Sequence, residues 1–153
     1  MSRGALSLLA LAFILTTNDR ANSTGAVAEG IAPGGVAKGY SYAINGNSLN
    51  ADAAGAAALA ACKKGPDQLA SGASPNASFA KARARCAVVF TFTNKCAATA
   101  LDPKDGTPGA GWAVGDTQKQ ADDEAIARCR STAGADRRDF CKIITQKCDG
   151  TAK

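Results

Sequence analysis

The sequence predicts an α+β domain in which two pseudo-repeats of strand, strand, helix and strand form an antiparallel sheet that packs on two helices and is stapled by disulfides. Three observations predict this fold. A short apolar segment opens the chain, six cysteines follow it, and the same order of strand and helix patterns occurs twice. The first observation indicates the compartment, the second a covalent framework, and the third the architecture.

The amino terminus has the composition of an export signal. Arg3 supplies a positive charge, and residues 5–15 form an apolar run that is too short for a bilayer, which needs about 20 residues. Small side chains at Ala21 and Ser23 suit signal peptidase. We therefore expect a signal peptide over residues 1–23, a single domain without a membrane span over residues 24–150, and a secreted or periplasmic protein.

The cysteines follow the expected signal peptide. An even number of cysteines in a small exported chain indicates disulfides, because the compartment is oxidising. The chain is rich in alanine and only 5% aromatic, so the core should consist of small side chains that contribute less burial free energy per residue. Disulfides can offset that deficit. The disulfide candidates are Cys62, Cys86, Cys96, Cys129, Cys141 and Cys148.

The first copy spans about residues 24–95. GAVAEGIAP and GYSYAI predict two strands, and an alanine-rich pattern that ends at Cys62 predicts a helix. Ser48 or Asn50 can cap this helix at its start, and Gly65 with Pro66 ends it.

The rest of the first copy comprises a loop and a strand. The stretch from Gly65 to Arg85 contains Gly, Ser, Pro and Asn and predicts a mobile surface loop. The run CAVVFTFTNKC then predicts a half-buried strand, with Val88, Phe90 and Phe92 on its buried face.

The second copy spans about residues 96–148 and repeats this order. CAATALDP and GWAVGD predict two strands, and CKIITQKC predicts a final strand that echoes CAVVFTFTNKC. Thr117 and Gln120 have the spacing of a capping box, so a helix should begin near residue 118. Ala121, Ala125 and Cys129 fall on one face of that helix.

The repeat restrains the disulfide pairing. Six cysteines permit fifteen pairings, and sequence alone leaves them open. If the copies fold alike, the helix cysteine should bond the cysteine before the last strand in each copy. The predicted pairs are Cys62–Cys86, Cys129–Cys141 and, by remainder, Cys96–Cys148, which would join the two copies.

No reactive constellation stands out. The chain has no histidine, which excludes Ser-His-Asp and Cys-His mechanisms, and it has no CxxC spacing for the common zinc, haem or thioredoxin-like sites. The acidic residues Asp122, Asp123 and Glu124 diverge on a helix and indicate a solvated face. We therefore predict no catalytic residue, metal ligand or cofactor. A hydrolase with a lysine or carboxylate centre is the less favoured alternative.

Aromatic and basic residues provide a candidate interaction surface. Tyr40 and Trp112 follow a glycine at matching repeat positions and suit either core packing or an aromatic contact surface. Basic residues precede a strand cysteine in both copies, where they form either a solvated face or a partner site. The candidates are Tyr40, Trp112, Lys81, Arg83, Arg85, Arg137 and Arg138. No base-stacking module accompanies the net charge of +5, so nucleic acid is not an expected partner.

The segments GAVAEGIA, GYSYAI, CAVVFTFTNKCAATA and GAGWAVGDT resemble domain of unknown function 4189, a bacterial family of small exported proteins, over about residues 25–148. The resemblance implies a secreted or periplasmic, cysteine-containing domain and transfers no catalytic residue. Export, stapling and the absence of a reactive motif favour a binding or interaction protein, whose partner is an envelope component or a secreted or host protein. The alternative is an inhibitor of a secreted hydrolase such as a lysozyme, because preorganisation lowers the cost of binding.

Overall fold

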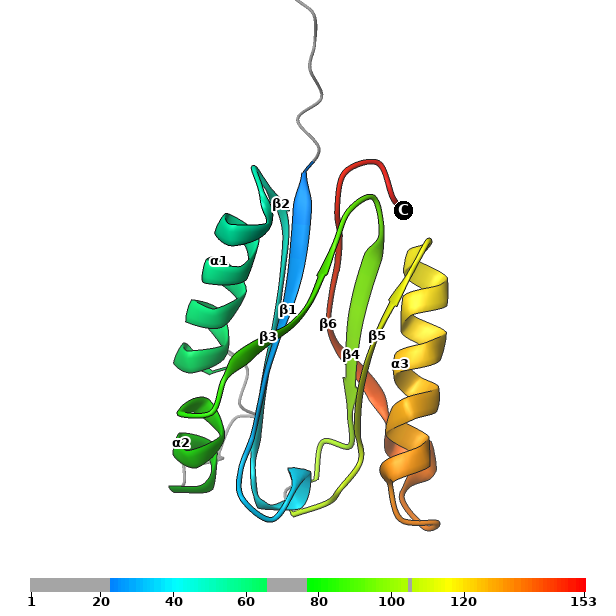
Figure 1. Ribbon diagram of the computed structural model, residues 1–153. Helices are drawn as coiled ribbons and strands as arrows, with labels where there is room; N and C mark the ends of the chain where they lie inside the picture. The colour runs from blue at the N-terminus through cyan, green and yellow to red at the C-terminus, as the bar shows by residue number, and fades with distance from the viewer. Residues whose placement is uncertain (1–22, 66–76, 105) are drawn as a thin grey trace, which may run out of the picture.

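Two helices and two sheets stack as four layers in the computed structural model (Figure 1). The structure describes residues 23–65, 77–104 and 106–153, so all but the last residue of the predicted signal peptide lies outside it. In chain order the described elements are β1 (Thr24–Ile31), η1 (Val36–Lys38), β2 (Tyr40–Ser48), α1 (Ala51–Lys64), α2 (Ala77–Arg83), β3 (Ala87–Phe92), β4 (Cys96–Leu101), β5 (Ala110–Gly115), α3 (Gln118–Thr132), η2 (Arg138–Phe140) and β6 (Lys142–Cys148), where η denotes a 3-10 helix.

Each half of the chain contributes one antiparallel three-stranded sheet. The strand orders are β2-β1-β3 and β5-β4-β6, so the first strand of each half is central. Helix α1 covers the outer face of the first sheet, and α3 covers that of the second (Figure 1). The predicted α+β class is confirmed. The strands form two sheets that face each other, where a single sheet was predicted, and this layout is consistent with the predicted repeat.

The last strand of each half contains a β-bulge. In β3 the pairs Val27–Phe90 and Ala28–Val88 leave Val89 as the extra residue. In β6 the extra residue is Ile144, because Thr145 and Ile143 pair with consecutive residues of β4. Both bulged residues come three positions after the cysteine that precedes the strand. The two halves therefore share an irregularity as well as an order of elements.

The helix ends follow from local chemistry. Asn50 caps α1, and its side chain accepts a bond from the N–H of Ala53. Thr117 and Gln120 form the predicted capping box, and α3 begins at Gln118 as expected. Gly65 caps the carboxyl end of α1 with a positive φ of 90°, a conformation that glycine adopts without steric cost.

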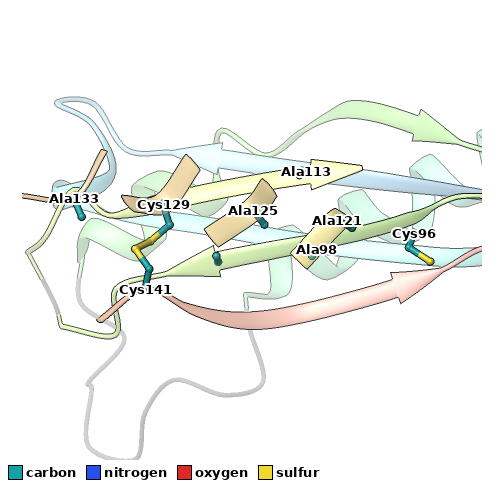
Figure 2. Close-up of a cluster of buried hydrophobic side chains, with 9 residues drawn as sticks. Cys96, Ala98, Ala113, Ala121, Ala125, Cys129, Ala133 and Cys141 are labelled. Atoms are coloured by element: carbon teal, nitrogen blue, oxygen red, sulfur yellow. A yellow bond between two sulfur atoms is a disulfide. The ribbon is translucent and has the colours of Figure 1, made fainter. Parts of the chain in front are cut away.

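Small side chains fill the layers between helix and sheet. Under α1 these are Ala26, Ala28, Ala43, Ala54, Ala58 and Cys62, and under α3 they include Ala98, Ala100, Ala113, Ala121, Ala125 and Cys129 (Figure 2). Such residues let the helices approach closely. At Gly111 a Cβ would lie 2.6 Å from the Cβ of Arg128, so even alanine would push α3 away from β5. The predicted small-residue core is present.

Larger side chains occupy the layer between the two sheets. Val27, Ile44 and Phe92 of the first sheet meet Ala97, Trp112 and Val114 of the second. Further along the same layer lies a cluster of Tyr42, Leu101 and Ala110. The hydroxyl oxygen of Thr99 is buried there and has no hydrogen-bond partner among the residues that the structure describes. The two halves are thus joined mainly by apolar burial of these larger side chains.

The structure contains the three cysteine pairs that the repeat predicts. Cys62–Cys86 and Cys129–Cys141 each tie a helix to the last strand of its own half, with Cα atoms 6.0 Å apart in both. Cys96–Cys148 joins directly opposite residues of β4 and β6. This bond lies within the second sheet, so the expectation that it joins the two copies was wrong. Cys96 opens the second half, whereas Cys148 closes it.

The carboxyl terminus makes a buried polar connection between the halves, in addition to the exposed ion pair of Lys95 with Asp116. Asp149 is fully buried, and its carboxylate oxygens accept bonds from the N–H groups of Asn47 at 2.8 Å and Asn94 at 3.2 Å. Both asparagines have a positive φ, which asparagine tolerates better than most residues. Gly150 in turn donates to the side chain of Asn47. We call this arrangement the Asp149 latch.

The predicted loop before Cys86 is partly helical. Residues 66–76 of that prediction lie outside the described residues, but α2 occupies Ala77–Arg83. Phe79 and Ala82 are buried on one face of α2, and the Phe79 ring packs edge-on against Tyr40 at 5.7 Å. The loop prediction was therefore wrong for this part, because burial of Phe79 and Ala82 at helical spacing outweighs the flanking glycine and proline signals.

Candidate functional site

Tyr40 and Trp112 lie at different positions of their hairpins. Tyr40 pairs with Ile31 at the hairpin end, and the corresponding end pair of the second hairpin is Leu101 with Ala110. Trp112 lies two residues further along, opposite Thr99. The predicted equivalence of the two aromatics was therefore wrong. Both still contact the cluster around Leu101 between the sheets, which is the packing role that the sequence left open.

The basic residues of α2 have two different environments. The guanidinium of Arg83 donates to the carbonyl oxygen of Lys64 at 3.3 Å and lies against Gly65, so Arg83 helps to close the end of α1. Lys81 and Arg85 are exposed. The predicted cluster therefore divides into one structural arginine and two cations that face solvent.

Arg137 is held in a partly buried ion pair. Its guanidinium donates to both carboxylate oxygens of Asp102, at 2.8 and 2.6 Å, and it stacks over the ring of Phe140 at 3.9 Å. Asp102 is almost fully buried. The hydrogen bonds from Arg137, followed by that from the Lys104 N–H, lower the pKa of Asp102 to about 2 against the opposing effect of burial. The neighbouring Arg138 is exposed. Of the two arginines, Arg138 is therefore the one whose side chain is available to a partner.

The two basic segments flank opposite outer layers. Helix α2 lies beside α1, whereas the connection from α3 to β6, which carries Arg137 and Arg138, lies beside α3 (Figure 1). Both segments lie toward the same end of the sandwich. The structure therefore does not gather the predicted basic residues into one patch.

The exposed surface of β3 is unlike that of any other described strand. Its residues Ala87 to Thr91 are all exposed, including Val88 at 39%, Val89 at 39% and Phe90 at 44%. Phe92 alone is buried, at 4%. The sequence predicted Val88, Phe90 and Phe92 on one buried face, and this was wrong for Val88 and Phe90.

The bulge explains the difference. Val88 pairs with Ala28, which faces α1, and a Cγ of Val88 lies 3.4 Å from the Cβ position of Gly55 on that helix. Phe90 pairs with Val27, which faces the second sheet. Directly paired residues share a face, so the extra residue Val89 places Val88 and Phe90 on opposite faces. An alternating sequence read without the bulge assigns them to the same face.

Phe90 extends the surface to the second half of the molecule. Its ring centroid lies 6.0 Å from that of Trp112, and the Arg128 guanidinium carbon lies 5.8 Å from the centroid of the Trp112 ring. Residues Ala87 to Thr91 together with Trp112 form what we call the β3 surface. Of these residues, the sequence singled out Trp112 as an interaction candidate and misassigned Val88 and Phe90 to the core.

Cations gather at the start of the β3 surface. Lys63 in the last turn of α1, Lys81 of α2 and Arg85 just before β3 are exposed, and none of them forms an ion pair with a described residue. The acidic residues described in the first half are Glu29 and Asp52. Asp52 lies at the opposite end of α1, and Glu29 lies on β1 opposite Ala87, with its side chain beside Tyr42. The apolar surface is therefore bordered by exposed cations that form no ion pair with a described residue.

Acidic side chains elsewhere do not converge on a centre. On α3, Asp123 pairs with Lys119, Glu124 pairs with Arg128, and Asp122 accepts from Gln118.

Between the sheets, burial raises the pKa of Tyr42, and the neighbouring Glu29 carboxylate raises it further. Within the described parts of the chain, no group of three His, Cys, Asp or Glu side chains is arranged to hold a metal. None of the described helices combines the length and apolar character needed to cross a membrane.

Comparison with known proteins yields one match. A family model described as Domain of unknown function (DUF4189) matches residues 25–148. This range begins in β1 and ends with Cys148, so it covers both sheets, all three disulfides and the β3 surface. No curated protein and no solved structure matches the chain.

Proposed function

We propose that this chain, which belongs to the DUF4189 family, is an interaction protein that binds a partner outside the cytoplasm through the β3 surface. The observation that carries the proposal is the run of five consecutive exposed residues on β3, which contains Phe90 and two valines and no charge. Exposed apolar groups of this kind on a stapled domain are typical of partner sites. Aromatic anchors such as Phe90 and Trp112 contribute strongly at such sites.

The disulfides support both parts of the proposal. Three disulfides in one chain are typical of proteins outside the reducing cytosol, which agrees with an export signal over residues 1–23. The Cys62–Cys86 bond also fixes the start of β3 to α1. A surface held in place in this way loses little conformational entropy when a partner binds.

A narrower form of the proposal is an inhibitor of a secreted hydrolase such as a lysozyme. The same fixed start of β3 favours it, because a rigid exposed strand suits insertion into an enzyme groove. A lysozyme activity assay with micromolar protein tests this form. Loss of activity that is relieved by Phe90→Asp supports it, and undiminished activity rejects it while leaving the broader proposal standing.

Photo-crosslinking in the producing cells tests the broader proposal. A photoreactive phenylalanine analogue at position 90 should give a discrete crosslinked adduct that excess unlabelled protein suppresses. The matched control places the analogue at Ile144, which is 42% exposed on the equivalent strand β6. The absence of an adduct at position 90, or the same adducts at both positions, would contradict the proposal.

A further inference from the structure

We infer that the partner segment of the β3 surface is an extended peptide chain with apolar and acidic side chains, which pairs with the open edge of β3 as an additional strand. This inference rests on the proposed function and specifies the chemistry of the partner. Three features of the described residues lead to it: the strand edge, the side chains beside it, and the charge at its start.

The strand edge supplies the backbone recognition. Among the described strands, β3 lies at the edge of its sheet and pairs with β1 alone. An edge strand presents N–H and C=O groups that an extended peptide can satisfy. A lipid headgroup layer cannot pair with them along a ladder. The exposed backbone edge therefore favours a peptide over a membrane as the occupant.

The equivalent strand shows what protection of an edge looks like. β6 carries Lys142 and Lys147, which are both exposed. In the facing sheet, the strand that β6 contacts is β2. Charged side chains on an edge discourage the pairing of another strand. β3 has no charged residue from Ala87 to Phe92. β3 therefore lacks the exposed lysines that protect the equivalent strand β6.

The side chains beside the edge define where apolar partner residues would lie. Val88 is exposed on the face that α1 covers, and Phe90 is exposed on the face toward the second sheet. A strand added at this edge places its own successive side chains alternately on these two faces. The partner segment should therefore have apolar residues on both faces near its centre.

The charge at the start of β3 selects against a second copy of this chain. Lys63, Lys81 and Arg85 are exposed there without an ion-pair partner among the described residues. Residues 87–94 contain no acidic side chain, so edge-to-edge pairing of two β3 strands would leave these cations uncompensated. A segment with acidic side chains at one end would complement them. The occupant is therefore a different, acidic chain.

Synthetic peptides test the inference directly. The probe is a fluorescent peptide of about ten residues with consecutive valines at its centre, which place apolar side chains on both faces, threonines toward both ends, and glutamates in place of the threonines at one end. Placing the glutamates at either end tests parallel and antiparallel addition. One comparison peptide has lysines in place of the glutamates, and another is N-methylated throughout its centre so that it cannot donate along the edge.

The expected result is binding of a glutamate peptide, measured by fluorescence anisotropy. The affinity should fall at least tenfold for the lysine peptide and for the N-methylated peptide. It should also fall as salt is raised, because the cations are exposed. Equal binding of the N-methylated peptide would overturn strand addition, and equal binding of the lysine peptide would overturn the acidic partner. Failure of every peptide to bind at millimolar concentration would overturn the whole inference.

Variants of the protein test whether the peptide binds at the β3 surface. The double variant Lys81→Glu with Arg85→Glu should bind the glutamate peptide at least tenfold more weakly than the native protein. The matched double variant Lys142→Glu with Lys147→Glu on β6 should bind it with an affinity that changes less than twofold. Binding to vesicles containing about one-third anionic lipid that exceeds binding to any peptide, or a dimer by sedimentation that Phe90→Asp dissolves, would also overturn the inference. A crosslink at position 90 together with no binding of any peptide would contradict strand addition but leave the proposed interaction function standing. The two proposals can therefore be rejected independently.

Discussion

The two halves of the molecule have the same order of elements but different surfaces. The outer face of α3 carries charged residues joined in pairs, such as Lys119 with Asp123 and Glu124 with Arg128. The outer face of α1 is mostly alanine, with charged residues confined to its two ends. Its exposed residues include Ala53, Ala56, Ala57, Ala60 and Ala61. The last strands differ in the same sense, because β6 carries exposed lysines and β3 exposes Val88, Val89 and Phe90.

The hairpin ends show the same contrast. In the first half the N–H of Ala32 donates to the carbonyl oxygen of Gly39, and in the second the N–H of Asp102 donates to that of Gly109. These positions correspond, but only Asp102 has a side chain that reaches another element, and it binds Arg137 next to η2. At this end the second half therefore has a polar side-chain contact that the first half lacks.

This difference separates two tasks that equivalent elements can perform. What the halves share, namely the small-residue layers, the bulges and the helix-to-strand disulfides, maintains the fold. What they do not share lies on the surface. There the first half exposes apolar side chains, and several of its cations have no ion-pair partner among the described residues. Substitutions at shared features should therefore change stability, whereas substitutions on β3 should change interaction.

Removing disulfides should have the largest effect on stability. The loop closed by Cys96–Cys148 spans 52 residues, against 24 for Cys62–Cys86 and 12 for Cys129–Cys141. Because longer loops lose more entropy when closed, replacing both cysteines by alanine should lower the free energy of unfolding by roughly 4 kcal/mol for the first pair and roughly 3 kcal/mol for each of the others. Denaturant titration measures these values. A loss for Cys96–Cys148 no larger than the loss for Cys129–Cys141 would mean that loop length is not the controlling quantity.

Breaking the Asp149 latch should have the next largest effect. Asp149→Asn leaves one oxygen to accept two backbone N–H bonds and turns an amide toward the other donor. We expect the free energy of unfolding to fall by about 2 kcal/mol, since a buried donor loses a charged partner. The control is Asp139→Asn, because Asp139 is 97% exposed and lies 4.0 Å from Arg130. A loss at Asp149 no larger than at Asp139 would mean that the Asp149 latch adds nothing to the connection between the halves.

Acid should weaken the second half through Asp102. Its pKa in the folded protein is about 2, below the value of about 4 expected when unfolded. The stabilisation is therefore complete above about pH 4 and is lost as the pH falls through about 2, and it amounts to roughly 2 kcal/mol. Unfolding midpoints measured across this range should show the loss in the native chain. They should show less of it in Asp102→Asn, and an unchanged acid dependence in that variant would assign the transition to other carboxylates.

Much of this architecture could be predicted from the sequence, and the failures have a common cause. The capping box at Thr117, the alanine layers and the cysteine pairing depend on short-range spacing or on comparison of the two copies, and all are legible in one chain. The position of Cys148 within the second sheet and the pairing of Arg137 with Asp102 depend on which elements meet in space. The bulge at Val89 shifts a strand by one residue without any glycine or proline to mark it.

The β3 surface was misassigned for that last reason, and Val89 provides the most delicate test of the comparison. Val89 and Ile144 are both bulged and similarly exposed, at 39% and 42%. Val89→Lys and Ile144→Lys should each change the free energy of unfolding by less than about 1 kcal/mol, since neither side chain is buried. Only Val89→Lys should reduce aggregation during heating, measured by light scattering, because β6 already carries lysines and β3 has no such protection. Equal reductions in both variants would show that the two edges are alike and that β3 has no special role.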